Sequence, residues 1–95
     1  MQFLFVMQVK ENAAPITSVQ RNSEVAYVRA TYGMGIVRQV WSRGDAAGAC
    51  LLIEACDESE ACAVIEALPL MRAGKLDIQL WMPLQAYRGF ADGGK

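Results

Sequence analysis

The sequence contains no histidine, and it has only three cysteines among 95 residues. The absence of histidine excludes Ser-His and Cys-His nucleophilic catalysis, His-Asp acid–base pairs and most catalytic zinc sites. Three cysteines cannot all pair with one another inside one chain, which fits a reducing compartment. We therefore expect a cytoplasmic protein that uses neither structural disulfides nor the common histidine chemistry.

The sequence also lacks an excess of charge and a long apolar run. Nine basic and ten acidic residues give a net charge of −1, so there is no electrostatic basis for nucleic-acid binding. No apolar run approaches the roughly 18 residues of a membrane span, and residues 1–8 lack the basic start of a signal peptide. We expect neither nucleic acid nor membrane as a partner. The apolar fraction of 54% is high for a small domain and indicates that several faces are buried.

Apolar periodicity predicts strands over residues 3–10, 34–42, 47–56 and 76–83. One helix is predicted from about residue 15 to Gly33, with either Pro15 or a capping box at Thr17 as its start. Its inward face is predicted from Ile16, Val19, Ser23, Ala26 and Ala30. A second helix is predicted from its cap Asp57 to Leu68, before Pro69. Residues 43–46 have the composition of a tight hairpin turn. Gly44 and Gly48 could instead belong to a phosphate-binding loop, but the lysine and the strand-to-helix context of such a loop are missing.

The order of elements is β-α-β-β-α-β, which predicts an α+β domain of the ferredoxin-like class. Its four-stranded antiparallel sheet is expected in the order 4-1-3-2, with both helices on one face. Residues 1–95 form one domain, with a core of about residues 2–84 and a C-terminal tail over residues 85–95. The tail contains enough aromatic residues that we expect it to pack over the mouth of its own chamber or onto a partner subunit.

Both alternating sets of strand residues are mostly apolar, so the sheet face without helices should also be covered. The simplest solution is a homodimer in which two sheets pack face to face around an interior chamber.

Three features in residues 36–84 carry a family resemblance. They are Arg38-x-x-Trp41 in the second strand, the capped helix that ends in Leu68-Pro69-Leu70, and the strand start at Asp77-Ile78. In order and spacing they resemble muconolactone isomerase and its relatives in the dimeric α+β barrel superfamily. The resemblance implies a dimer or a higher assembly of dimers. It also implies an interior pocket for a small lactone, enol or aromatic-derived acid.

Side chains alternate across a strand, so the chamber should receive every second residue. The predicted site consists of Gln8, Gln39, Trp41, Glu54, Gln79 and Trp81, with Asp77 near the rim. Leu4, Val6, Val37, Cys50 and Leu52 are expected on the chamber side as well. The opposite side, which is expected to dock on the helices, includes Leu51 and Ile53 of the third strand and Leu76, Ile78, Leu80 and Met82 of the fourth. A one-residue slip of the second strand would present Arg38 to the chamber in place of Gln39 and Trp41, and the sequence leaves both registers open.

Glu54 in a mostly apolar chamber would have a raised pKa and could carry a proton for an isomerase. The alternative is that Glu54 lies near the strand end and pairs with Arg38, Arg29 or a partner's arginine. The three glutamines would orient a carbonyl or carboxylate, or bond to one another across the dimer. The two tryptophans would wall a flat ligand, or fill the core or the dimer interface. Glu54 and Asp77 are too few to hold a metal, and no cofactor is expected.

Three functions remain open from the sequence, because a fold alone does not select one. The first is a proton-transfer enzyme of the muconolactone isomerase type. The second is a cofactor-free oxygenase of the same superfamily, and the third is a non-catalytic dimeric binding or stress-associated module.

Overall fold

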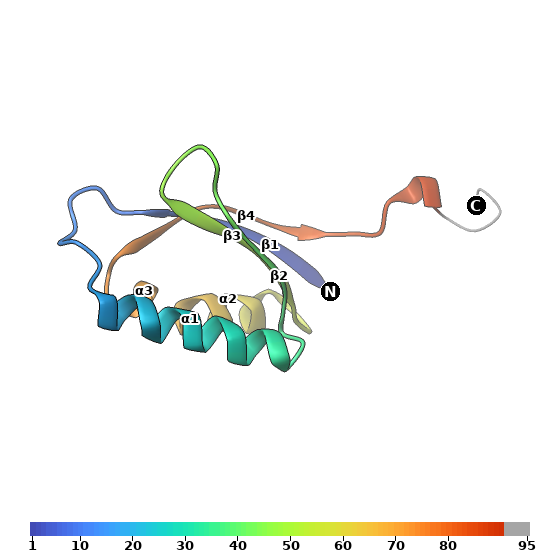
Figure 1. Cartoon of the computed structure of the whole chain (residues 1–95). Coiled ribbons are helices and arrows are strands. Elements are labelled where there is room, and N and C mark those ends of the chain that lie inside the picture. The colour runs from blue at the N-terminus through green and yellow to red at the C-terminus, as the bar shows by residue number, and fades with distance from the viewer. Residues whose placement is uncertain (91–95) are drawn as a thin grey trace.

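Four antiparallel strands and three α-helices make up residues 1–90, the part of the chain that the computed structural model describes. In chain order the elements are β1 (Gln2–Val9), α1 (Ser18–Gly33), β2 (Val37–Ser42), β3 (Gly48–Glu54), α2 (Glu58–Glu66), α3 (Pro69–Arg72), β4 (Leu76–Leu84) and a 3-10 turn, η1 (Arg88–Phe90). The sheet order is β2-β3-β1-β4, which is the predicted order counted from the other edge. All three α-helices lie on one side of the sheet (Figure 1). The predicted ferredoxin-like fold is confirmed.

Side-chain caps set the starts of the two longer helices. The Thr17 hydroxyl accepts a hydrogen bond from the Gln20 amide at 3.1 Å, and the Gln20 side chain accepts one from the Thr17 amide at 3.0 Å. This capping box begins α1 at residue 18 and decides against Pro15 as the start. Asp57 caps α2 in the same way by accepting from the Glu60 amide at 2.8 Å.

The second predicted helix is divided in two. It ends at Glu66, and Pro69 begins the short helix α3 instead of only following a helix end. Proline is favoured in a first helical turn because the amide hydrogen that it lacks would have no partner there. No helix in residues 1–90 has both the length and the hydropathy required to cross a membrane.

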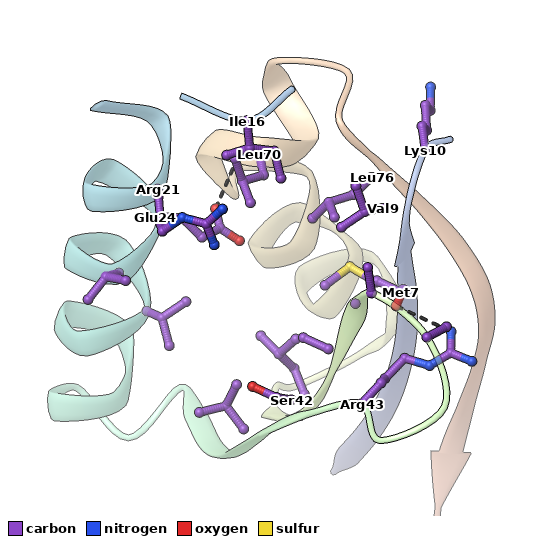
Figure 2. Close-up of a pocket in the computed structure, with 18 of the residues that line it drawn as sticks. Met7, Val9, Lys10, Ile16, Arg21, Glu24, Ser42, Arg43, Leu70 and Leu76 are labelled. Atoms are coloured by element: carbon purple, nitrogen blue, oxygen red, sulfur yellow. Dashed lines mark hydrogen bonds between the residues drawn. The ribbon is translucent and has the colours of Figure 1, made fainter. Parts of the chain in front are cut away.

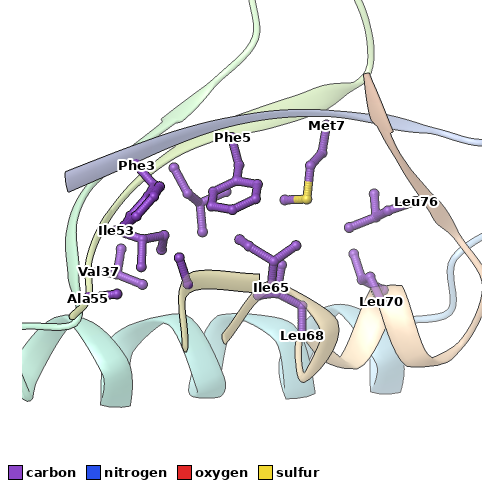
Figure 3. Close-up of a cluster of buried hydrophobic side chains, with 12 residues drawn as sticks. Phe3, Phe5, Met7, Val37, Ile53, Ala55, Ile65, Leu68, Leu70 and Leu76 are labelled. Carbon is purple, nitrogen blue, oxygen red and sulfur yellow. The ribbon is translucent and has the colours of Figure 1, made fainter. Parts of the chain in front are cut away.

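The hydrophobic core lies between the helices and the helix side of the sheet (Figure 3). Its largest fully buried side chains are Phe3, Phe5, Met7, Val37, Leu51, Ile53, Ile65 and Leu68. The predicted inward direction of Leu51 and Ile53 is confirmed. Val37, which the strand pattern assigned to the chamber, lies on the helix side opposite Ile53 and is buried.

A β-bulge interrupts β4 at Gln79. Val6 of β1 lies opposite Leu80, whereas the next residue, Met7, lies opposite Ile78. Gln79 is therefore an extra residue without a counterpart, and an extra residue reverses the alternation of all later side chains. The prediction for the second half of β4 assumed an uninterrupted strand.

The residues after the bulge accordingly lie on the faces opposite to those predicted. Trp81 lies on the helix side, with its ring centroid 6.0 Å from that of Phe5 and 6.4 Å from that of Phe3. Leu80 and Met82 lie on the open face, 48% and 36% exposed. The predicted direction of these three side chains is wrong, because the sequence pattern has no signal for the inserted residue.

The inward face of α1 also differs from the prediction. Val19 is 73% exposed, and Ala26 and Ala30 are exposed as well. Thr31 is buried and Glu24 half-buried in their place. The helix has few large apolar residues, so periodicity alone did not identify the correct face.

The C-terminal segment leaves the sheet at the end of β4 and extends away from it (Figure 1). Residues 85–90 therefore do not fold back over the chain's own sheet, and a position at the chamber mouth or on a partner subunit remains a prediction. Residues 91–95 of the predicted tail lie outside the described residues.

Gly48 begins β3 and lies opposite Gln8 of β1. A side-chain carbon at this position would collide with the backbone carbonyl oxygen of Met7, whereas at Gly44 in the β2–β3 loop it would meet nothing within 4 Å. We expect Gly48→Ala to lower the free energy of unfolding by roughly 1–3 kcal/mol, as measured by urea denaturation. The control, Gly44→Ala, should stay within about 0.5 kcal/mol of the parent protein. Equal effects of the two changes would contradict the close approach.

Candidate functional site

A cavity of about 910 Å³ lies between α1 and the helix side of the sheet, at the end of β1 where the large core side chains stop. We call it the helix-side cavity. Much of its lining is apolar and comes from Met7, Val9, Leu51, Leu70 and Leu76. Small residues leave its space open, because Ala13, Ala14, Ala46, Ala47, Gly48 and Ala49 also line it.

One face of α1 forms the wall opposite the sheet. The lining residues of this helix are Arg21, Glu24, Val25, Val28 and Arg29. Their spacing of i, i+3, i+4, i+7 and i+8 is that of a single helical face. Figure 2 shows Arg21 and Glu24 projecting from α1 toward the space in front of the sheet. Sequence reasoning missed these residues, although their spacing was the signal that could have found them.

Glu24 is the only acidic residue among the described residues that line this cavity. Its carboxylate accepts a hydrogen bond from the Leu70 amide at 3.0 Å, in the first turn of α3. Burial raises the pKa of Glu24, and the hydrogen bond from Leu70 opposes this rise only in part. A carboxyl group with a raised pKa exchanges protons more readily near neutral pH than an exposed one.

Four basic residues, Lys10, Arg21, Arg29 and Arg43, line the same cavity. The Arg43 guanidinium donates two hydrogen bonds to the Asp45 carboxylate, at 2.9 and 2.7 Å. The Lys10 ammonium lies 3.7 Å from a carboxylate oxygen of Asp77. Within residues 1–90, Arg21 and Arg29 form no ion pair, so the α1 wall contributes positive charge that favours an anion.

The rim of the cavity is held by a buried lysine. Lys75 is 8% exposed, and its ammonium donates to the carbonyl oxygen of Ala14 at 2.7 Å. This hydrogen bond fastens the segment between β1 and α1, which includes the lining residues Ala13 and Ala14, to the start of β4.

Most of the predicted site lies on the opposite, open face of the sheet. Gln39 lies opposite Leu52, and Trp41 lies opposite Cys50. Arg38 is an extra residue between Val37 and Gln39, a second bulge. Of the two registers that the sequence left open, the structure has the one that presents Gln39 and Trp41. Trp81 is separated from this group because it packs on the helix side.

Glu54 lies at the end of β3, where its carboxylate forms an ion pair of 2.8 Å with the N-terminal ammonium of Met1. This hydrogen bond lowers the pKa of Glu54, and the charge of Arg38 lowers it further. The expected rise in the pKa of Glu54 is therefore wrong. Glu54 instead follows the alternative expectation, in which it lies near the strand end and pairs with a positive charge. Its main partner is the Met1 ammonium and not an arginine.

Two of the predicted glutamines bond to each other within one chain. The Gln79 side chain donates to the Gln8 side-chain oxygen, and its own oxygen accepts from the Arg43 guanidinium. Arg43 also donates to the Met7 carbonyl oxygen at 3.5 Å (Figure 2). Because Arg43 also lines the helix-side cavity, it connects that cavity to the amide pair on the sheet.

No family model matches the chain, and no curated protein matches it. Among solved structures, the chain is similar to 5-chloro-2-hydroxyhydroquinone dehydrochlorinase (TftG) from Burkholderia phenoliruptrix AC1100, determined in complex with 2,5-dihydroxybenzoquinone. The TM-score is 0.73 at 16% sequence identity, over 90% of this chain and 94% of that chain. The likeness shows that this chain has the fold of that small protein over almost its whole length.

The raised pKa of Glu24 predicts a specific dependence of stability on pH. The folded state favours the neutral carboxyl, so the contribution of Glu24 to the free energy of unfolding should fall as the pH rises above about 4.5, the ordinary value. Glu24→Gln retains an oxygen to accept from the Leu70 amide but has no charge to bury. We expect the stability of this variant, relative to the parent, to increase between pH 4 and 7 in urea denaturation.

The control for this experiment is Glu11→Gln, at an exposed turn after β1. Its stability relative to the parent should vary less with pH. A Glu24→Gln variant that followed the parent at every pH would contradict the raised pKa.

Proposed function

We propose that the chain binds a small ring-shaped acid, enol or lactone in the helix-side cavity and transfers a proton on it through Glu24. The proposal rests mainly on one observation, a half-buried carboxylate of raised pKa that lines a large and mostly apolar cavity. The muconolactone isomerase type of reaction, in which a double bond moves by proton transfer, is the specific form that we favour.

The size and lining of the cavity support a ligand of this class. Pockets for small molecules enclose about 300–1,000 Å³ and combine apolar walls with a few polar groups. Here Met7, Leu51 and Leu76 offer apolar surface to a ring. Arg21 and Arg29 offer positive charge to its oxygen atoms.

The proposed step moves one proton and requires no second reactant. The Glu24 carboxylate takes a proton from a ring carbon next to a carbonyl, and the electron pair of that C–H bond moves to give an enolate. The positive charges of the α1 wall stabilise the enolate oxygen. The protonated Glu24 then returns the proton to another carbon of the ring, which completes an isomerisation.

We also propose that the chain forms a homodimer through the open face of its sheet. The apolar side chains of this face are Leu4, Val6, Trp41, Leu52, Leu80 and Met82, of which Trp41 is 47% exposed. A continuous apolar surface of this kind is typical of a protein interface.

The predicted site on the open face is the second candidate. In it Gln8, Gln39, Trp41 and Gln79 would bind the ligand between two sheets, with Glu54 as the proton carrier. The observation that favours this site is the joined pair of Gln8 and Gln79, which presents amide groups among apolar neighbours. The lowered pKa of Glu54 makes it the weaker proton carrier of the two.

An exchange experiment distinguishes the two sites. 2,5-Dihydroxybenzoquinone is a planar ring with two carbonyl and two hydroxyl groups. In D₂O a ring carbon of its enol form can accept a deuteron from the Glu24 carboxyl and then lose its original proton to the carboxylate, which exchanges the ring hydrogen. We expect the parent protein to bind this probe in calorimetry and to accelerate the exchange, followed by NMR. Glu24→Gln should bind it and lose roughly 100- to 10,000-fold of the acceleration.

Glu54→Gln is the matched variant for the second site. It should exchange as fast as the parent if Glu24 carries the proton, and loss of exchange in this variant alone would transfer the function to the open face. Binding without any exchange by the parent protein favours the non-catalytic module. Oxygen uptake with a quinol would favour the cofactor-free oxygenase instead.

The homodimer is tested by introducing a charge on the open face. Leu80→Asp should weaken dimerisation at least about tenfold, or about 1.4 kcal/mol, because a carboxylate would be buried between two apolar sheets. Val19→Asp on the exposed side of α1 is the control and should not change it. Sedimentation velocity over a range of concentrations measures both variants, and equal sedimentation of the two would contradict the sheet interface.

A further inference from the structure

The charges along the helix-side cavity differ from those of the chain as a whole. The sequence has nine basic and ten acidic residues and a net charge of −1. Within residues 1–90, four basic residues line this cavity but only one acidic residue does. The fold therefore gathers positive charge at one apolar recess of an almost neutral chain. Charge of one sign in such a recess concentrates ligands of the opposite sign.

Two of the four cations, Arg21 and Arg29, have their charge available for a ligand. The other two face carboxylates of the chain itself. On a helix, an arginine commonly pairs with an acidic residue three or four positions away, and Arg29 has none at this spacing. Arg21 has only Glu24, whose carboxylate accepts from the Leu70 amide at 3.0 Å. Both charges therefore lack an acidic residue of their own helix that is not already engaged.

Arg21 and Arg29 flank Glu24 along α1. Eight residues separate them, which corresponds to about 12 Å along the helix axis. Val25 and Val28 line the cavity between them. Both arginines are exposed, so a ligand can reach their guanidinium groups without displacing packed side chains. The wall thus has two cationic ends and an apolar middle, with the proposed proton carrier between the ends.

We propose that the helix-side cavity selects a ring with two acidic groups, of which Arg21 binds one and Arg29 the other. The inference rests on the proton-transfer function proposed above and specifies the charge of its substrate. A guanidinium and a carboxylate match in geometry, because two parallel N–H groups meet two oxygen atoms. An acidic enol is also such a group, since its oxygen carries the charge that develops in the proposed proton transfer.

Two arginines are needed because the ligand lies next to a carboxylate. An uncompensated dianion beside Glu24 would disfavour the ionised form that takes the proton. With one guanidinium on each acidic group, the charge of the ligand is balanced before the proton moves. Arg21 and Arg29 are therefore specificity-determining residues, and Glu24 remains the group that acts on the ring.

The first test compares terephthalate with its monomethyl ester by calorimetry at low ionic strength. The two compounds share the ring and differ mainly in one negative charge. We expect the parent protein to bind terephthalate at least about tenfold more tightly than the ester. Arg21→Gln and Arg29→Gln should each reduce this ratio to about threefold or less, because glutamine keeps a hydrogen-bonding amide but has no charge.

Arg72→Gln is the matched control. Arg72 is exposed on the short helix α3 and lies outside the lining residues of the cavity, so this variant should keep the ratio of the parent protein. An equal loss of the ratio in Arg72→Gln would indicate a general effect of net charge and would overturn the inference.

The same measurements separate this inference from the proposed function. If the parent protein binds terephthalate and its ester equally while it binds and exchanges 2,5-dihydroxybenzoquinone, only the two-arginine selection is overturned. If it binds none of the three compounds, the proposed function is overturned together with the inference.

The second test locates the bound acid by NMR of methyl-labelled protein. Val25 and Val28 line the cavity, whereas Val6 lies on the open face and Val19 is 73% exposed at the start of α1. Terephthalate should shift the methyl resonances of Val25 and Val28 and leave those of Val6 and Val19 nearly unchanged. Shifts confined to Val6 would place the acid on the open face and overturn the inference.

Discussion

The packing of β1 against the helices determines how most of the other side chains in this structure are placed. Phe3, Phe5 and Met7 are almost fully buried on one side of this strand, and β1 lies in the interior of the sheet, between β3 and β4. Once these three side chains point to the helices, strand pairing determines which residues of β3 and β4 share their side. The helix-side cavity begins where this row of large side chains ends, because alanines and a glycine line the space beyond it.

The two faces of the sheet have different chemistry as a result. The helix side contains the cavity in which a carboxylate lies among apolar residues and arginines. The open face contains apolar side chains and an amide pair. Arg43 contacts both regions, since it lines the cavity and bonds to Gln79. A ligand in the cavity and a partner on the open face would therefore both lie close to the Arg43 side chain.

Two bulges explain why strand patterns alone misplaced several side chains. Gln79 and Arg38 are extra residues in the two edge strands, and each reverses the alternation of the residues after it. At Gln79 the reversal carries Trp81 into the core and turns Leu80 outward, where it enlarges the apolar open face. A change of one residue in register thus decides whether a tryptophan supports the core or a binding surface.

The sequence by itself determined the order of the strands and the two longer helices, the sheet order, the Asp57 cap and the inward rows of β1 and β3, and it left Pro15 and Thr17 as alternative starts of α1. These features depend on neighbours in the chain and on strong apolar periodicity, which are local signals. Only the tertiary structure decided the bulges, the rotation of α1, the helix-side cavity and the partner of Glu54. The Met1 ammonium is 53 residues away from Glu54 along the chain, and the Glu24 carboxylate meets an amide 46 residues away. Contacts of this range are set by how the layers pack, so the charge state of either carboxyl could not be inferred from its neighbours in the sequence.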